Sequence, residues 1–131
     1  MVKIILAAHG DFAQAMLDTA AKIMPFDTGE VDVYTVSGKV DFEKLAVRIK
    51  KSAGGKGGAL ILTDIFGGTA CNLCAGLTHG IKNVNVISGL NLNMLLCALS
   101  NRCKLDANAL AAKVLEDGLK SIINITEKLG K

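Results

Sequence analysis

Two hydrophobic patterns alternate along this chain: short, almost wholly apolar runs, and longer stretches in which apolar residues recur every three or four positions. The first pattern predicts strands buried on both faces, and the second predicts amphipathic helices. Strands are expected at residues 2–8, 31–36, 59–63 and 84–87, and helices at 11–24, 41–52, 69–78, from 91 and from 106. This alternation with short connections predicts an α/β fold with a doubly wound, mostly parallel sheet flanked by helices.

Two segments of this pattern need a more specific prediction. The first helix is expected to bury the face that carries Phe12, Met16, Ala20 and Ile23, and to stop before the only proline. The segment 121–126, with the sequence SIINIT, contains enough β-branched residues for an edge strand, although it could instead continue the preceding helix.

Length and composition limit the possible classes of protein. The 131 residues fit a single domain spanning 1–131. The chain is 50% hydrophobic but only 4% aromatic, so a core of mainly aliphatic side chains is expected, which suits strands buried on both faces. The net charge of +3 comes without a long block of one sign, so no footprint for nucleic acid or for a membrane surface is expected. No apolar run approaches the roughly 18 residues of a membrane-spanning helix, and residues 1–3 lead directly into a strand, so a cytoplasmic protein with reduced cysteines is expected.

The candidate chemistry follows two of the predicted strands. His9 comes directly after the first strand, and Asp64 comes directly after the strand at 59–63. Because parallel sheets gather their chemistry at the carboxyl ends of strands, we expect these two side chains to be neighbours. A carboxylate that accepts a proton from one ring nitrogen leaves the other nitrogen free to attack phosphorus. The alternatives are a hydrogen-bonded structural histidine and an aspartate that caps a helix or turn.

Glycines beside these residues support a phosphoryl site. Gly10 lets the chain turn and lets phosphoryl oxygens approach backbone amides. Between the third strand and the third helix, the amides of Gly68, Thr69 and Ala70 can converge on an anion with the helix dipole behind them. The glycine-rich loop 54–58 precedes a strand rather than a helix, so it is not expected to bind phosphate.

No metal site is expected. The spacing of Cys71 and Cys74 matches half of a zinc site or a redox pair, but no second pair of this spacing completes it. Core packing of these thiols is therefore favoured, with metal or redox chemistry as the alternative. His79 precedes a glycine at a predicted helix end and is interpreted as a favourable cation there.

Three blocks together resemble a known family. They are the strand ending in Ala-Ala-His9-Gly10, residues 62–72 with the sequence LTDIFGGTACN, and residues 87–95 with the sequence ISGLNLNML. Their order and spacing are similar to those of the enzyme IIA component of the mannose-type sugar phosphotransferase systems. The pattern Asp-x-(Phe or Trp)-Gly-Gly-(Ser or Thr)-x-x-Asn is rather specific. The family typically has serine at position 69 and often proline at position 70, and neither change removes a donor.

The resemblance implies a phosphoryl relay. His9 would accept a phosphoryl group from the phosphorylated carrier HPr and pass it to a histidine of a IIB component, which serves the membrane IIC and IID subunits. Asp64 would orient His9, and Gly68, Thr69 and Ala70 would supply amides or a hydroxyl. No metal or nucleotide cofactor is implied, and the chain would be cytoplasmic, possibly at the membrane permease complex.

The resemblance also implies a homodimer in which edge strands are exchanged, and segment 121–126 is the expected strand. Phe66 and Leu90, at strand ends, are candidate partner contacts, with local packing as the alternative. Two other functions stay open at this stage. One is the phosphotransfer subunit of dihydroxyacetone kinase, which usually lacks the aromatic-Gly-Gly stretch, and the other is a non-catalytic flavodoxin-like binding module.

Overall fold

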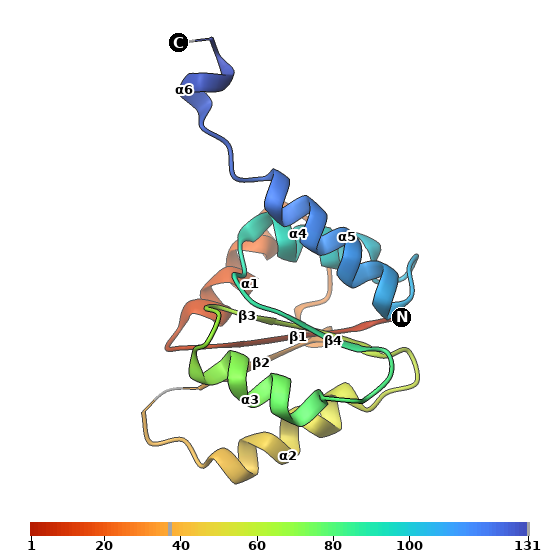
Figure 1. The fold of residues 1–131 in the computed structure, drawn as a ribbon. Helices are drawn as coiled ribbons and strands as arrows, with labels where there is room; N and C mark the ends of the chain where they lie inside the picture. Colours follow the sequence, from red (N-terminus) through yellow and green to blue (C-terminus); the bar gives the residue numbers. More distant parts are fainter. Residues whose placement is uncertain (37, 131) are drawn as a thin grey trace.

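The computed structural model describes residues 1–36 and 38–130 and shows an α/β sandwich around one parallel sheet (Figure 1). The elements are β1 (Lys3–Ala8), α1 (Phe12–Ile23), the short 3-10 helix η1 (Thr28–Glu30), β2 (Val31–Thr35), α2 (Phe42–Ala53), β3 (Ala59–Thr63), α3 (Thr69–Thr78), β4 (Val84–Ile87), α4 (Leu92–Asn101), α5 (Ala107–Lys120) and α6 (Ile125–Lys128). The strand order is β2-β1-β3-β4, and every pairing is parallel. The predicted architecture, with a parallel sheet flanked by helices, is confirmed.

Both faces of the sheet are covered, because its central strands are apolar on both sides. Ile4, Leu6, Leu60 and Leu62 point into one core layer, which α1, α4 and α5 complete. The alternate residues of the same strands, such as Ile5 and Ile61, point into a second layer formed with α2 and α3. Figure 1 shows the two groups of helices on opposite faces of the sheet. Full burial of β1 and β3 explains their nearly continuous apolar sequences.

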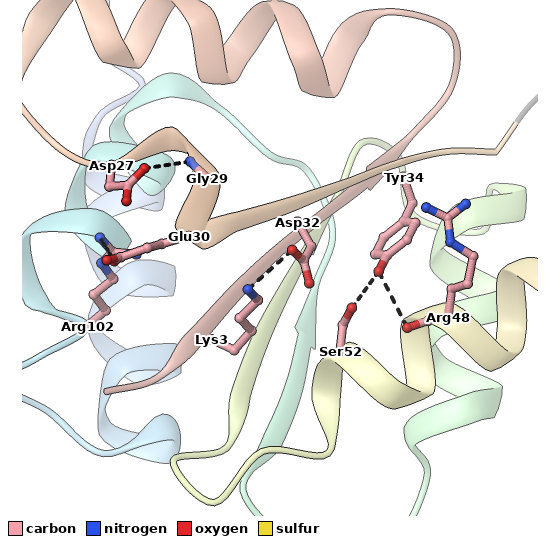
Figure 2. Close-up of polar contacts among 9 residues, drawn as sticks. All are labelled: Lys3, Asp27, Gly29, Glu30, Asp32, Tyr34, Arg48, Ser52 and Arg102. Carbon is pink, nitrogen blue, oxygen red and sulfur yellow. Dashed lines mark hydrogen bonds and ion pairs between the residues drawn. The ribbon is translucent and has the colours of Figure 1, made fainter.

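Polar contacts fasten the outer parts of the sheet (Figure 2). Lys3 on β1 pairs with Asp32 on the edge strand β2, at 3.2 Å between Nζ and Oδ1. Arg102, which follows α4 and is 7% exposed, pairs with Glu30 of η1 at 2.8 Å. These contacts tie β2 and its entry turn to the body of the molecule.

Helix α1 buries a different face from the predicted one. Its buried residues are Ala13, Leu17 and Ala20, whereas Phe12 and Ile23 are 42% and 55% exposed. Met16 is partly buried against the core, so the buried face is rotated by about one residue from the predicted stripe. Small alanine side chains let the helix lie close to the sheet, and the larger Phe12 stays at the rim.

The C-terminal segment differs from the predicted edge strand. Residues 122–124 leave α5 without joining the sheet, and α6 follows them away from the body of the molecule (Figure 1). Asn124 caps α6, because its side-chain oxygen accepts the amide of Glu127 at 3.1 Å. A strand over 121–126 is therefore wrong for this chain on its own, since β propensity needs a neighbouring strand to pair with.

Candidate active site

The carboxyl ends of β1 and β3 lie side by side and bring His9 and Asp64 together. The two strands are paired in the register Ala7 to Thr63, so Asp64, directly after Thr63, and His9, two residues after Ala7, leave the sheet at the same edge. His9 Nδ1 lies 2.7 Å from Asp64 Oδ2, and the backbone amide of His9 donates to the same oxygen at 3.0 Å. The predicted neighbourhood of the imidazole and the carboxylate is thus present in the structure.

The surroundings of Asp64 keep it ionised. Partial burial alone would raise the pKa of this carboxyl, but hydrogen bonds from the His9 amide and ring and from the Ile65 amide outweigh burial and lower the pKa below 3.8. The Ile65 amide donates to Oδ1 at 3.0 Å, so both carboxylate oxygens accept hydrogen bonds. An ionised carboxylate only accepts, so the facing Nδ1 of His9 carries a hydrogen, and in the neutral ring Nε2 then keeps its lone pair. The His9 side chain is 44% exposed and the Asp64 side chain only 15%, which leaves the ring open to a reaction partner.

A glycine turn brings the N-terminus of α3 to the imidazole. Gly67 has φ +79, a conformation that favours glycine, and Gly68 is the N-cap of α3. A Cβ at position 68 would lie 2.7 Å from Ile65 Cγ2 and 3.2 Å from the Ile65 carbonyl oxygen, so glycine lets this turn pack closely against Ile65. The same Cβ would lie 3.4 Å from His9 Cε1, which places the turn in contact distance of the ring. The side chain of Asn72 donates to the Gly67 carbonyl at 3.1 Å and holds the turn.

The start of α3 offers one exposed amide to an anion. Asn72 is the first residue whose amide reaches an acceptor across the turn, the carbonyl of Gly68, so the amide of the exposed Thr69 points out of the helix start. Ala70 differs from the prediction, because it is 0% exposed and belongs to the core layer of α2 and α3. The Gly68 amide differs from the prediction, because it donates to the Ile65 carbonyl at 3.1 Å within the turn. The described residues give α3 no side-chain cap, which leaves this positive end of the helix dipole beside His9.

Gly10 also adopts a glycine-favouring conformation, with φ +54, directly after His9. Its carbonyl accepts a hydrogen bond from the Thr35 hydroxyl at 3.2 Å, which fixes the turn from the neighbouring strand β2. Sequence reasoning missed Thr35, because only the β1–β2 pairing shows that it lies beside Gly10. Asn72 was present in the family pattern, but its hydrogen-bonding role was not predicted.

The two predicted partner contacts lie in different environments. Phe66 is 80% exposed, and its neighbour Ile65 is 59% exposed, so both side chains are accessible beside the active-site turn. Leu90 is only 5% exposed and belongs to the core layer of α1, α4 and α5. Its amide donates to the Thr63 carbonyl, which pulls Leu90 back over the sheet. Local packing, the alternative interpretation, therefore describes Leu90.

The described part of the chain contains no group of three or more histidine, cysteine, aspartate or glutamate side chains placed to hold a metal ion. No helix in it is long and apolar enough to cross a membrane. Cys71 is half-buried and Cys74 is buried in the core layer of α2 and α3, as the packing interpretation of these thiols requires.

Comparisons with known proteins agree with this geometry. A family described as "PTS system fructose IIA component" matches residues 3–115. The fructose-specific EIIA component of Bacillus subtilis is 28% identical over 124 residues, which cover 93% of this chain and 82% of that protein. The sorbose-specific EIIA component of Klebsiella pneumoniae is 34% identical over 115 residues, covering 84% and 82% of the two chains.

Solved structures show the same similarity in three dimensions. The phosphotransferase system component EIIA from Streptococcus agalactiae superposes with a TM-score of 0.87 at 28% identity, over 97% of this chain and 99% of that one. The mannose/sorbose-specific IIA subunit from Enterococcus faecalis gives a TM-score of 0.80 at 25% identity, over 94% and 93% of the chains. A sheet-edge histidine with a carboxylate partner, a family match over most of the chain and these structural relatives lead to one conclusion: the chain belongs to the mannose-type enzyme IIA family of sugar phosphotransferase systems.

Proposed function

We propose that His9 is the residue on which this phosphocarrier holds its phosphoryl group, with Nε2 as the attacking atom. The observation that carries the proposal is the 2.7 Å contact between His9 Nδ1 and the ionised Asp64, because it sets the tautomer and leaves Nε2 unprotonated. The family membership makes phosphotransfer the function of the chain.

The transfer is a displacement at phosphorus between two nitrogens. The lone pair of His9 Nε2 attacks the phosphorus carried by a histidine of HPr, and the nitrogen–phosphorus bond of the donor breaks with its electron pair returning to the donor ring. His9 keeps the hydrogen on Nδ1 throughout, so its ring becomes cationic as the new bond forms. Asp64 stabilises that cation, in the way a carboxylate stabilises an imidazolium in other catalytic pairs. A histidine of the IIB component then attacks the same phosphorus in the second transfer.

The phosphoryl oxygens are proposed to lie over the start of α3. The amide and the hydroxyl of the exposed Thr69 supply donors there, and the amide of the buried Ala70 lies one residue further into the helix start. Gly10 and Gly68 add no side chain to this volume, and a Cβ at position 68 would lie 3.4 Å from the His9 ring. Preorganised donors of this kind stabilise the charge that develops on the oxygens during transfer.

HPr and a IIB component are the proposed partners, and the exposed Phe66 is the proposed apolar contact for them. A protein donor must bring its own histidine onto His9, so an exposed aromatic side chain beside the active-site turn is well placed for docking. Service of membrane IIC and IID subunits, and a cytoplasmic site of action, belong to the same proposal.

A homodimer that exchanges segment 121–126 also belongs to this proposal. Ile122 and Ile125 are 79% and 60% exposed in the single chain, and Leu129 is 69% exposed. These apolar side chains favour pairing with a second copy, which would bury them and give the segment a strand neighbour.

The proposal is tested by intact mass after incubation with phosphoenolpyruvate, enzyme I and HPr. The unmodified chain is expected to gain one acid-labile phosphoryl group, and His9→Ala is expected to gain none. His79→Ala is the matched control, since His79 lies at the other end of α3, and it is expected to behave like the unmodified chain. Phosphorylation of His9→Ala would contradict the proposal.

A further inference from the structure

A hollow of about 540 Å³ lies between the edge strand β2 and helix α2. Its lining extends from Lys3, at the start of β1, to Tyr34, which pairs with Ala7, and it includes neither His9 nor Asp64. We propose that this hollow, lined by Tyr34, Arg48, Lys51 and Ser52, is a second anion site that binds a phosphate monoester. It is separate from the phosphoryl cradle at α3.

The hydroxyl groups of Tyr34 and Ser52, which Figure 2 shows in contact, belong to two residues that line the hollow. Tyr34 is 7% exposed, and its hydroxyl contacts the Ser52 hydroxyl of α2 in a short hydrogen bond. The Arg48 carbonyl lies 3.4 Å from the same tyrosine oxygen as a second acceptor. A phenol has one hydrogen, so when Tyr34 donates it to Ser52 the serine hydrogen can point to a ligand. When Tyr34 donates to the Arg48 carbonyl instead, Ser52 donates to Tyr34, and a ligand binds through Arg48 and Lys51.

Arg48 supplies the fixed cation. Its guanidinium carbon lies 5.2 Å from the centroid of the Tyr34 ring, a cation–π contact that holds the side chain over the wall of the hollow. Among residues 1–36 and 38–130, no carboxylate lies within ion-pair distance of Arg48 or Lys51. A guanidinium held on an aromatic ring and free of a carboxylate is suited to bind phosphate with two of its N–H groups.

The charges that line the hollow do not cancel. Asp32 is the carboxylate of its lining, and Lys3 neutralises it at 3.2 Å. Arg48 and Lys51 therefore remain as two uncompensated positive charges, which match the charge of a phosphate monoester dianion.

The size of the hollow favours a small ligand. Volumes of about 300–1,000 Å³ are typical of small-molecule sites. Because β2 is an edge of the sheet, no further strand covers this side, and the hollow is open to solvent. A phosphate group can bind at the wall while the remainder of the ester extends along β2.

The experiment is an amide and arginine Nε chemical-shift titration of the full chain, with inorganic phosphate and with glucose 6-phosphate. Sodium chloride at matched ionic strength controls for screening. We expect saturable shifts at Tyr34, Arg48 and Ser52 with both phosphates and none with chloride. Tighter binding of the ester would show that its sugar also contacts the hollow, and equal binding would show that phosphate alone is recognised. Chemical-shift changes at Thr69 and Ala70 report binding at the active site separately. Absence of binding at the hollow is therefore distinguished from absence of binding at the active site.

Two variants and one control make the test specific. Arg48→Gln is expected to weaken phosphate binding at the hollow about tenfold or more, and Lys51→Gln to weaken it severalfold. Lys104→Gln removes one exposed charge in the turn after α4 and is expected to change nothing. The proposal would be overturned if the chemical shifts changed linearly and chloride reproduced them. It would also be overturned if a folded Arg48→Gln variant bound phosphate as tightly as the Lys104→Gln control.

Discussion

Replacing Asp64 by asparagine removes one charge and leaves the shape of the side chain almost unchanged. In the structure, Oδ2 accepts hydrogen bonds from the His9 amide and ring, and Oδ1 accepts one from the Ile65 amide. An asparagine has one oxygen and one NH₂ group, so it cannot accept on both sides. In either orientation its NH₂ group faces a backbone N–H, and in one of them it also faces Nδ1 and favours the tautomer whose Nε2 is protonated.

The size of the effect follows from these contacts. Hydrogen bonds to a charged group contribute about 1.5–3 kcal/mol each, and the bond to Nδ1 strengthens when the ring becomes cationic. Losing that increment in the transition state slows transfer by about 10- to 150-fold, because 1.4 kcal/mol corresponds to about a factor of ten. The fold should persist, since Asp64 lies at the sheet edge and is outside both core layers.

A single-turnover assay measures this effect. Phosphorylated HPr is mixed with an excess of the chain, the reaction is quenched at successive times, and the fraction of phosphoryl groups transferred to the chain is measured. Asp11→Asn is the matched control, because Asp11 is an exposed carboxylate two residues after His9 and its side chain does not cap α1. We expect the control to transfer at nearly the unmodified rate. An Asp64→Asn rate equal to that of Asp11→Asn would refute the role of the carboxylate.

Three further predictions concern stability and reactivity. Hydrogen bonds lower the pKa of Asp64 in the folded state, so the ionised residue stabilises the fold above pH 3.8 and loses that contribution as the pH falls through the lower folded value. The difference in unfolding free energy between the unmodified chain and Asp64→Asn should therefore shrink on acidification. A difference that stays constant in denaturant titrations would contradict this. Gly68→Ala should lower both the melting temperature and the transfer rate, because its Cβ would meet Ile65 at 2.7 Å. Gly76→Ala, with open space around the added Cβ, should instead stabilise α3 by about 0.5–1 kcal/mol. Equal effects of the two substitutions in thermal melts would be inconsistent with a close approach at position 68. Burial raises the pKa of the Cys74 thiol to about 11, so iodoacetamide at mildly alkaline pH should modify the exposed Cys103 well before Cys74. Peptide mass mapping measures this order, and the reverse order would refute the burial argument.

The sequence predicted those features that depend on local pattern and strand order. The apolar runs of β1 and β3 indicated a sheet buried on both faces, and parallel pairing then placed His9 beside Asp64. The glycines at 67 and 68 indicated a turn into α3, which the structure contains. These inferences hold because period, turn chemistry and sheet topology are encoded over short stretches of sequence.

Other features depended on packing between distant segments. The buried face of α1 contains Ala13 and Ala20, whose small size lets the helix approach the sheet, and hydrophobicity alone favoured Phe12 instead. Leu90 resembles a loop residue in sequence, but its bond to the Thr63 carbonyl draws it into the core. For the C-terminal segment, the Asn124–Glu127 spacing was a local signal for a capped helix start that the β-branched pattern outweighed.

The most direct test of the account is to identify which atom carries the phosphoryl group. Phosphorus–nitrogen correlation spectroscopy of the phosphorylated, ¹⁵N-labelled chain distinguishes the two ring nitrogens of histidine. The account predicts a single phosphohistidine on His9, bonded through Nε2, with Nδ1 still protonated and facing Asp64. Phosphorylation at Nδ1, or at any residue other than His9, would contradict it.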